Sequence, residues 1–304
     1  MPCYHPLTAY RGRRTSSGKS EILFDKSQAL KVGSGLLIQL PCGQCVGYRL
    51  ERSRQWAMRC HHEASLYQDN CFITLTYSDE HLPSDKSLHV DHFQKFMKRL
   101  RKRFGEGVRY YHCGEYGEKY MRPHYHACLF NFDFPDKKIW KENNGNRLYI
   151  SESLSELWPF GFVTIGDVTF ESAAYVARYI MKKVNGDLAE SHYERVDWDT
   201  GEVYHLKPEY TTMSRRPGIG SNWFAKFKDD IFPQDYVVIN GKKLKPPRFY
   251  DRCYELEYPS DFDTIKKKRV KNAKKHLDNN TPDRLNVREQ VQLARLKRLP
   301  RSLD

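Results

Sequence analysis

The sequence has no apolar stretch near the roughly 18 residues that a membrane-spanning helix requires. Its N-terminus also lacks the basic and then apolar layout of a secretory signal peptide. Eight cysteines in 304 residues are too few for a disulfide framework, so reduced thiols, with room for one metal site, fit the composition better. No internal repeat and no Walker-type G-x-x-x-x-G-K-[ST] motif is present. We therefore expect a soluble, intracellular protein without a nucleotide-driven motor of its own.

Basic residues are in clear excess over acidic residues in this chain. Its 51 Lys and Arg residues outnumber the 38 Asp and Glu residues, which gives a formal net charge of +13 at pH 7. Such a charge indicates a polyanionic partner, more simply nucleic acid than an acidic membrane surface. A hydrophobic content of 39%, with 20 Tyr and 16 Phe, is enough for a real core. One large domain or two modest ones are expected.

The composition divides the chain into three predicted parts. Residues 1–65 form an N-terminal segment that contains a C-x-x-C motif, residues 66–260 form the main domain with an extension from about 186, and residues 261–304 form a basic helical tail. Residues 266–275 contain seven Lys or Arg residues and no acid. Such a run is typical of a solvated or disordered arm that binds phosphates.

The C-x-x-C motif lies in Pro41-Cys42-Gly43-Gln44-Cys45. Together with Cys3 and His5 it could form a tetrahedral zinc site that holds the N-terminal segment in place. Only one pair of cysteines is evident from the spacing, so buried free thiols are the alternative. A structural Zn²⁺ on Cys3, Cys42 and Cys45 is therefore one of two open interpretations.

Two histidines stand at a strand's period of two in residues 121–130. Because side chains alternate along a strand, His124 and His126 point to the same face. A strand over residues 109–116 precedes them through a glycine turn, and the resulting hairpin places Glu115 beside both imidazoles. A carboxylate and two imidazoles with open positions suit Mg²⁺ or Mn²⁺. An edge strand with two exposed histidines is the alternative.

Residue periodicity predicts further elements around this hairpin, and their mixture indicates an α+β fold. The predicted sheet is antiparallel and carries the metal residues on the face that a helix covers. The elements are a helix over 48–63, a strand over 71–77, a helix capped by Asp91, a strand over 162–168, a helix over 172–184, and a last helix opened by Thr281 and Pro282.

The predicted helix over residues 172–184 has a polar and an apolar face. At about 100° per residue, Tyr175, Tyr179 and Lys182 fall together, opposite the side that docks. A phenol with a pKa of about 10 is a poor nucleophile at neutral pH, so a catalytic tyrosine needs help. A divalent cation can polarise a phosphate, and a lysine can favour the phenolate or neutralise a phosphate. Ordinary packing of both tyrosines on a sheet is the alternative.

Three motifs in this order resemble those of the HUH-endonuclease rolling-circle replication initiators. They are the strand Phe72-Ile73-Thr74-Leu75-Thr76-Tyr77, the trio His124-Tyr125-His126, and the helix Tyr175-x-x-x-Tyr179-x-x-Lys182. Three further strings, over about residues 1–260, resemble the initiators of gokushovirus-type microviruses, which are small phages with circular single-stranded DNA. The strings are Pro41-Cys42-Gly43-Gln44-Cys45, residues 213–220 (MSRRPGIG) and Trp223-Phe224.

The resemblance implies a Rep-type central antiparallel sheet with helices packed on it. It also implies roles for individual residues: Glu115, His124 and His126 as metal ligands, Tyr175 and Tyr179 as paired nucleophiles, and Lys182 as their accompanying lysine. One departure concerns the N-terminal segment. The relatives often carry a further cysteine three residues after C-x-x-C, where this chain has Tyr48.

The implied activity is metal-dependent strand transfer at a single-stranded DNA origin. A tyrosine nicks the strand and leaves a 5′-phosphotyrosine and a free 3′-OH, and the displaced strand is later rejoined into a circle. Host polymerase and host helicase are the expected partners, in the cytoplasm of a bacterial host. DNA contacts are expected from Arg122, Arg178, Lys183, Arg215 and Arg216, and a plain surface turn is the alternative for the last two. A non-catalytic DNA-binding or packaging protein and a metal-dependent nuclease that uses water are the two alternatives.

Overall fold

The computed structural model describes residues 3–16, 20–31, 36–117, 120–143, 145–178, 183, 188–196 and 200–298. Contacts between residues divide the chain into two compact units. The terminal unit consists of the described parts of Met1–Arg52 and Val270–Pro300, and the central unit is formed from Ser53–Arg269. The predicted boundaries near residues 65 and 260 stay predictions, since a division by contacts does not test which segments fold independently.

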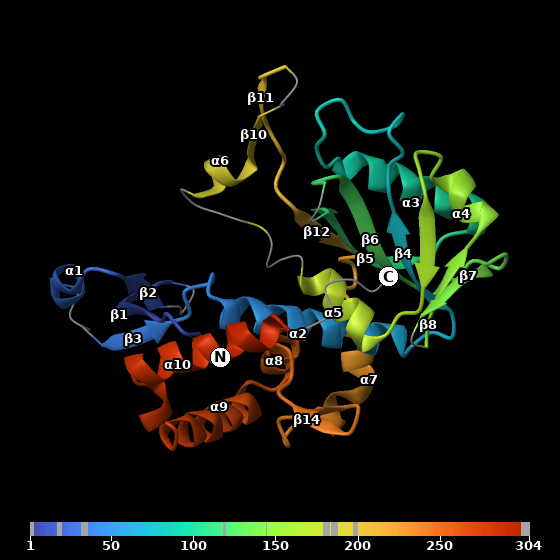
Figure 1. The fold of residues 1–304 in the computed structure, drawn as a ribbon. Coiled ribbons are helices and arrows are strands. Elements are labelled where there is room, and N and C mark those ends of the chain that lie inside the picture. The colour runs from blue at the N-terminus through green and yellow to red at the C-terminus, as the bar shows by residue number, and fades with distance from the viewer. Residues whose placement is uncertain are drawn as a thin grey trace. The chain divides into compact units, whose positions relative to one another are not determined.

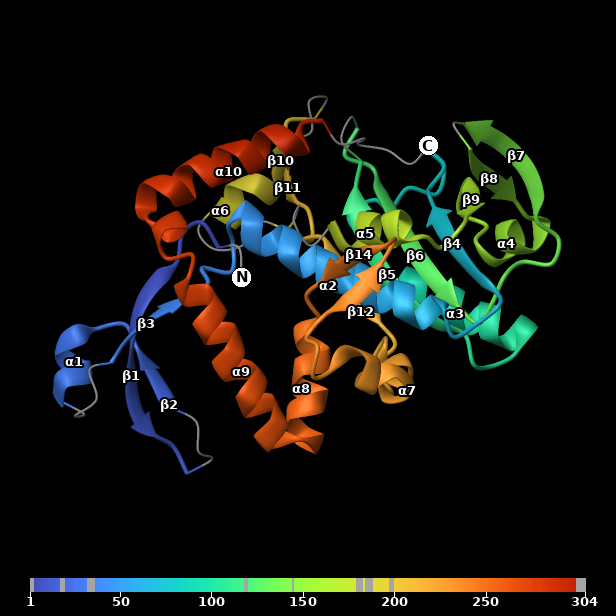
Figure 2. The same ribbon diagram turned by 90° about the horizontal axis from the view of Figure 1, so that it is seen from below.

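The central unit is built on one sheet of seven strands, which Figure 1 shows and in which Figure 2 labels β9 as well. Its strand order is β12-β5-β6-β4-β9-β8-β7, and every neighbouring pair is antiparallel. This confirms the α+β class and the predicted central antiparallel sheet. The strands are β4 (Asn70–Leu75), β5 (Arg109–Tyr116), β6 (Pro123–Phe130), β7 (Lys138–Asn143), β8 (Asn146–Ile150), β9 (Val163–Gly166) and β12 (Tyr210–Met213).

Strand β6 is an inner strand of this sheet, with β5 on one side and β4 on the other (Figure 2). Its alternating side chains belong to two separate cores. Tyr125 and Leu129 pack with residues of α3 (Val90–Phe104), whereas Cys128 and Phe130 pack with residues of α2 (Val46–Ala64) and α5 (Phe170–Arg178). Both faces of the sheet are therefore covered by helices, and the face of β6 that bears the histidines is the one against which α2 and α5 pack.

Helix α3 begins earlier than the sequence predicts. Its N-cap is His89, whose side chain makes no capping hydrogen bond, and Asp91 lies in the first turn. The prediction of Asp91 as N-cap is therefore wrong. The Asp91 carboxylate instead accepts a hydrogen bond of 2.8 Å from Lys95, one turn further on.

The other elements of the central unit are short. The strand predicted over 162–168 corresponds to β9, and the helix predicted over 172–184 corresponds to α5, which is described as far as Arg178. The remaining elements are α4 (Glu152–Leu157), α6 (Leu188–Tyr193), β10 (Glu194–Val196), β11 (Val203–His205), α7 (Ser221–Ile231), β13 (Val237–Ile239), β14 (Lys242–Leu244) and α8 (Arg248–Glu257).

Helix α9 (Pro259–Lys274) contains most of the basic run at 266–275. Phe262 and Ile265 are buried in an aromatic core with α7 and α8. The Arg269 guanidinium then donates to the carboxylates of Asp235 and Asp251, at 2.8 Å in each case. The run is therefore a largely exposed helix through residue 274, which agrees with a solvated basic helix, and only the alternative of a disordered arm is wrong there.

The terminal unit contains a small sheet of order β2-β1-β3 and a final helix. The cap of that helix confirms the prediction, because Thr281 Oγ1 accepts a hydrogen bond from the Arg284 amide and Pro282 occupies the first turn. No helix in the described ranges is long and apolar enough to cross a bilayer. The elements are β1 (Leu7–Arg14), β2 (Ser20–Leu23), α1 (Lys26–Lys31), β3 (Leu37–Leu40), η2 (Asp278–Asn280) and α10 (Pro282–Leu296).

Candidate metal centre and its tyrosine

The β5–β6 hairpin brings Glu115, His124 and His126 together. In the register of this hairpin Glu115 pairs with His124, and His126 is two residues further along β6 on the same face. The Glu115 Oε1 atom is 2.9 Å from Nε2 of His124 and 2.9 Å from Nε2 of His126. The ligand atoms of all three residues lie within 4.8 Å of one another. The predicted grouping is therefore present, and the role of its members as ligands stays a prediction.

The far side of each imidazole is held by a neighbour. Nδ1 of His124 lies 3.1 Å from the Arg122 carbonyl oxygen, and Nδ1 of His126 lies 3.0 Å from Thr74 Oγ1. A carbonyl oxygen can only accept, so Nδ1 of His124 carries a proton. Outer partners of this kind orient metal-binding histidines and fix which nitrogen faces the metal.

This donor set fits a divalent cation. Without the hydrogen bond to Glu115, His124 keeps its proton on Nδ1 and presents a lone pair on Nε2, so that the imidazole and the carboxylate become two acceptors for one ion. A cation between them satisfies both acceptors. Two imidazoles and one carboxylate leave open positions for water or a phosphate oxygen, which suits Mg²⁺ or Mn²⁺.

Glu115 is a buried carboxylate, only 1% exposed. Burial alone would raise its pKa, but the hydrogen bonds from His124 and His126, together with the charges of the two rings, outweigh burial and lower the pKa to about 2. The group is therefore ionised at neutral pH. A fixed negative charge inside a protein requires a compensating positive charge.

Tyr175 lies beside this group. On helix α5 the small residues Ala173 and Ala177 are fully buried against the sheet, and Tyr175 is half-buried. The tyrosine ring stands edge-on to the ring of His126, with centroids 5.3 Å apart and an interplanar angle of 90°. The Arg178 guanidinium lies 5.8 Å from the centre of the tyrosine ring. The phenol therefore occupies the face of the sheet that bears the histidines.

The other predicted residues have different placements. Tyr179 and Lys182 lie outside the described residues, and Lys183 is half-buried. Arg122 donates to the Tyr77 carbonyl at 2.8 Å and forms an ion pair with Asp79. Arg215 and Arg216 are exposed, and neither makes a hydrogen bond or an ion pair with another described residue. Cys3, Cys42 and Cys45 lie together in the terminal unit.

Sequence reasoning missed the residues that shape the turn carrying Arg215 and Arg216. Glu63 on α2 is fully buried, and its carboxylate accepts hydrogen bonds from Nε of Arg109 at 2.5 Å and from the Gly220 amide at 2.6 Å. Gly220 has φ +79°, and a Cβ there would lie 2.7 Å from the Tyr250 hydroxyl. Only glycine fits this position without strain. No local pattern distinguishes Glu63 from a surface glutamate of a basic helix.

A second polar group was also missed, at the start of α3. His89, Asp91 and His92 have ligand atoms within 4.8 Å of one another. These side chains already have partners, because His89 Nε2 lies 2.9 Å from an Asp85 oxygen and His92 Nδ1 lies 2.6 Å from the Tyr77 hydroxyl. We assign this group to the packing of α3.

Comparisons with known proteins find one matching family model and related phage proteins. The family model of the replication-associated protein ORF2/G2P matches residues 70–184, which contain Glu115, His124, His126 and Tyr175. The chain is 39% identical over 254 residues to replication-associated protein ORF2 of Spiroplasma virus 4, covering 78% of this chain and 75% of the relative. It is 38% identical over 232 residues to replication-associated protein VP4 of Bdellovibrio phage phiMH2K, covering 73% and 69%.

A third relative is more distant. Replication-associated protein ORF4 of Chlamydia phage 1 is 29% identical over 238 residues, which cover 74% of this chain and 56% of the relative. No solved structure matches the chain at comparable significance. The chain therefore belongs to the replication-associated proteins of gokushovirus-type phages, the family that its motifs resemble.

Proposed function

We propose that this protein nicks single-stranded origin DNA by tyrosine transesterification and rejoins the displaced strand into a circle. The observation that carries the proposal is the edge-on contact of Tyr175 with His126, at 5.3 Å between ring centroids. A hydroxyl nucleophile and a cation-binding trio on one face of a sheet are the two parts that phosphodiester transfer requires. A protein that only binds DNA has no use for this arrangement.

Each described residue of the site has a distinct task in this proposal. Glu115, His124 and His126 would hold Mg²⁺ or Mn²⁺, which polarises the scissile phosphate and stabilises the charge that develops on it. Glu115 stays ionised because its pKa is about 2, the bonds and charges of the histidines outweighing burial. Thr74 and the Arg122 carbonyl keep both imidazoles in orientation.

The covalent step exchanges one phosphodiester bond for another. The Oη atom of Tyr175 attacks the scissile phosphorus, the P–O3′ bond breaks, and the phenolic proton passes through solvent to the departing 3′ oxygen. The 5′ side stays on the enzyme as a phosphotyrosine, and a host polymerase extends the free 3′-OH. Because the bond energy is conserved in the ester, rejoining requires no ATP. Tyr179 as second nucleophile and Lys182 as its partner complete the proposal from the family resemblance.

Basic residues around the centre supply the charge that a DNA strand requires. Arg178 lies over the Tyr175 ring, and the exposed Arg215 and Arg216 extend from a turn whose backbone Glu63 fixes. Phosphate contacts of this kind bind any sequence and weaken as salt rises. Lys183 and Arg122 are further proposed contacts, and unwinding is assigned to a host helicase.

A trapping assay tests the proposal. Because the chain does not reveal the origin sequence, the substrate is a labelled pool of single strands of random sequence, incubated with Mn²⁺ and separated on a denaturing gel. We expect a metal-dependent covalent adduct, whose sequenced DNA identifies the cleavage site. The adduct is expected to decrease in Tyr175→Phe and to disappear in the double variant Tyr175→Phe, Tyr179→Phe. Tyr258→Phe, at the exposed end of α8, is the matched control.

The alternatives give other outcomes in the same gel. Cleavage without an adduct indicates a nuclease that uses water, and retention without cleavage indicates a DNA-binding or packaging protein. Glu115→Gln tests the metal-binding group separately from the tyrosine, because it removes a charged ligand and leaves Tyr175 in place. An adduct that forms equally well in Glu115→Gln contradicts the proposed metal centre.

A further inference from the structure

The three N-terminal cysteines meet because of how the small sheet of the terminal unit ends. Strands β1 and β3 are antiparallel, and their ladder ends at the pair Leu7 and Leu40. Cys3 precedes Leu7 by four positions and Cys42 follows Leu40 by two, so both lie beyond the same end of the ladder. Cys45 directly precedes α2, whose N-terminus favours negative charge.

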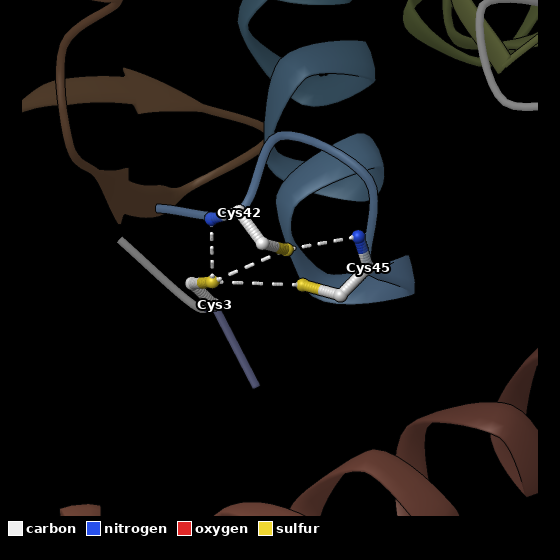
Figure 3. Close-up of side chains that lie close together, drawn as sticks. All are labelled: Cys3, Cys42 and Cys45. Atoms are coloured by element: carbon white, nitrogen blue, oxygen red, sulfur yellow. Dashed lines mark hydrogen bonds between the residues drawn. The ribbon is translucent and has the colours of Figure 1, made fainter. Parts of the chain in front are cut away.

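The spacing of the sulfurs is that of a metal site. Sγ of Cys3 lies 3.6 Å from Sγ of Cys42 and 3.8 Å from Sγ of Cys45 (Figure 3). A disulfide requires about 2.05 Å, so these are separate thiols. Two ligands at about 2.3 Å from Zn²⁺ and at the tetrahedral angle are about 3.8 Å apart. The observed separations therefore match a tetrahedral zinc–thiolate site.

Backbone amides point at all three sulfurs. The Cys42 amide donates to Cys3 Sγ at 3.3 Å, the Cys45 amide donates to Cys42 Sγ at 3.2 Å, and the amides of Tyr4 and Tyr48 donate to Cys45 Sγ at 3.3 and 3.4 Å. A thiol is a weak acceptor, and a thiolate is a much better one. Three thiolates in one place require a cation.

The other buried cysteines, Cys71 among them, lie in apolar cores. Cys60, Cys113 and Cys128 lie in the apolar core between the sheet and α5, where they act as small hydrophobic residues. Such a core is the surrounding expected for buried free thiols, which are the sequence-based alternative to a zinc site. The N-terminal trio instead faces amide donors and is partly open, since Cys3 and Cys42 are half-buried.

We propose that Cys3, Cys42 and Cys45 bind one Zn²⁺ as thiolates, and that this ion holds the N-terminal segment against the start of α2. Binding releases the thiol protons to solvent. Among the described residues no fourth histidine, cysteine or acid joins the group, so solvent takes the fourth position. His5, which the sequence suggested as a ligand, instead lies 2.7 Å from an oxygen of Glu289 on α10.

This site is independent of the proposed nicking reaction, so a zinc assay tests it alone. The full chain is expressed with zinc in the medium, purified without chelator and analysed for metal by mass spectrometry. We expect one zinc per chain, and at least about a tenfold loss in Cys42→Ser. Cys253→Ser, a half-buried cysteine on α8, is the matched control and retains the metal. Glu115→Gln also retains it, which separates this ion from one at the β5–β6 hairpin.

Thiol mapping guards against a variant that merely misfolds. In the unaltered chain, alkylation of Cys3, Cys42 and Cys45 is expected to be slow until a chelator is added and fast afterwards, while Cys253 reacts at one rate throughout. Equal rates with and without chelator, or zinc retained in full by Cys42→Ser, overturn the proposal. His5→Gln is expected to retain zinc, and loss of zinc from that variant overturns the three-cysteine assignment.

Discussion

The buried carboxylate of Glu63 is predicted to hold together the turn that carries Arg215 and Arg216. The change Glu63→Gln keeps the size of the side chain and removes its charge. One carboxylate oxygen accepts from Nε of Arg109 and the other from the Gly220 amide, so an amide group in its place can serve only one of the two donors. The other donor is left facing an NH₂ group inside the protein.

The expected loss of stability follows from the burial of this pair. Removing one partner of a buried ion pair typically costs about 3–5 kcal/mol. Arg109 retains a second acceptor, the Pro217 carbonyl at 2.7 Å, and its side chain is 14% exposed, so water compensates in part. We therefore expect the lower end, about 3 kcal/mol off the free energy of unfolding of the central unit.

The measurement is urea unfolding at pH 7, followed by both tryptophan fluorescence and circular dichroism to check that the transitions coincide. Glu255→Gln is the control, because Glu255 forms an exposed ion pair with Lys266 at 3.0 Å and its loss should cost less than about 1 kcal/mol. A double-mutant cycle with Arg109→Met isolates the pair. If Glu63→Gln costs no more than the control, the buried carboxylate does not anchor the turn.

Three further predictions concern single side chains. Burial, reinforced by the charge of a neighbouring histidine, lowers the pKa of His62 to about 3. The unfolded chain therefore binds a proton at this histidine as the pH falls below about 6.5, whereas the folded chain does not. The free energy of unfolding should fall by about 2 kcal/mol between pH 7 and pH 5. In His62→Asn, urea titrations at both pH values should lack this loss. Thr74→Val removes the hydroxyl beside Nδ1 of His126, and calorimetry with Mn²⁺ should show roughly tenfold or more weaker binding, whereas unchanged affinity would deny the hydroxyl an orienting role. Arg215→Gln and Arg216→Gln should each reduce the slope of log affinity for single-stranded DNA against log salt by about 0.7, and an unchanged slope would exclude phosphate contacts there.

The grouping of Glu115, His124 and His126 could be predicted from the sequence because its geometry is local. Glu115 and His124 are nine positions apart, and a hairpin with an ordinary register is enough to bring them together. The same holds for the Thr281 cap, which involves the next three residues. The docking face of α5 was also predictable, since Ala173 and Ala177 recur at helical spacing and are both fully buried.

The turn around Gly220 could not be predicted, because its contacts are distant in sequence. Glu63 is 46 positions from Arg109 and 157 from Gly220. Local preference also misled at α3, where the Asp91 carboxylate binds Lys95 and leaves the cap to His89. The basic run of α9 was judged by its charge alone, whereas the buried Phe262 and Ile265 anchor the first half of the helix and the partly buried ion pairs of Arg269 hold the next turn.

The placement of Tyr175 depends on how closely α5 can approach the sheet. Strand β6 directs Tyr125 into the core under α3 and His126 to the opposite face of the sheet. A helix that packs on this second face therefore also lies beside the group of Glu115, His124 and His126. Helix α5 meets this face through Ala173 and Ala177, which have no side chain beyond Cβ to hold the helix away. The tyrosine, two positions from either alanine, is therefore brought to the rim of the contact, beside the histidine instead of beneath the helix. The packing that buries the alanines thus positions the phenol, and a larger residue at either position would displace it from the centre without changing any ligand.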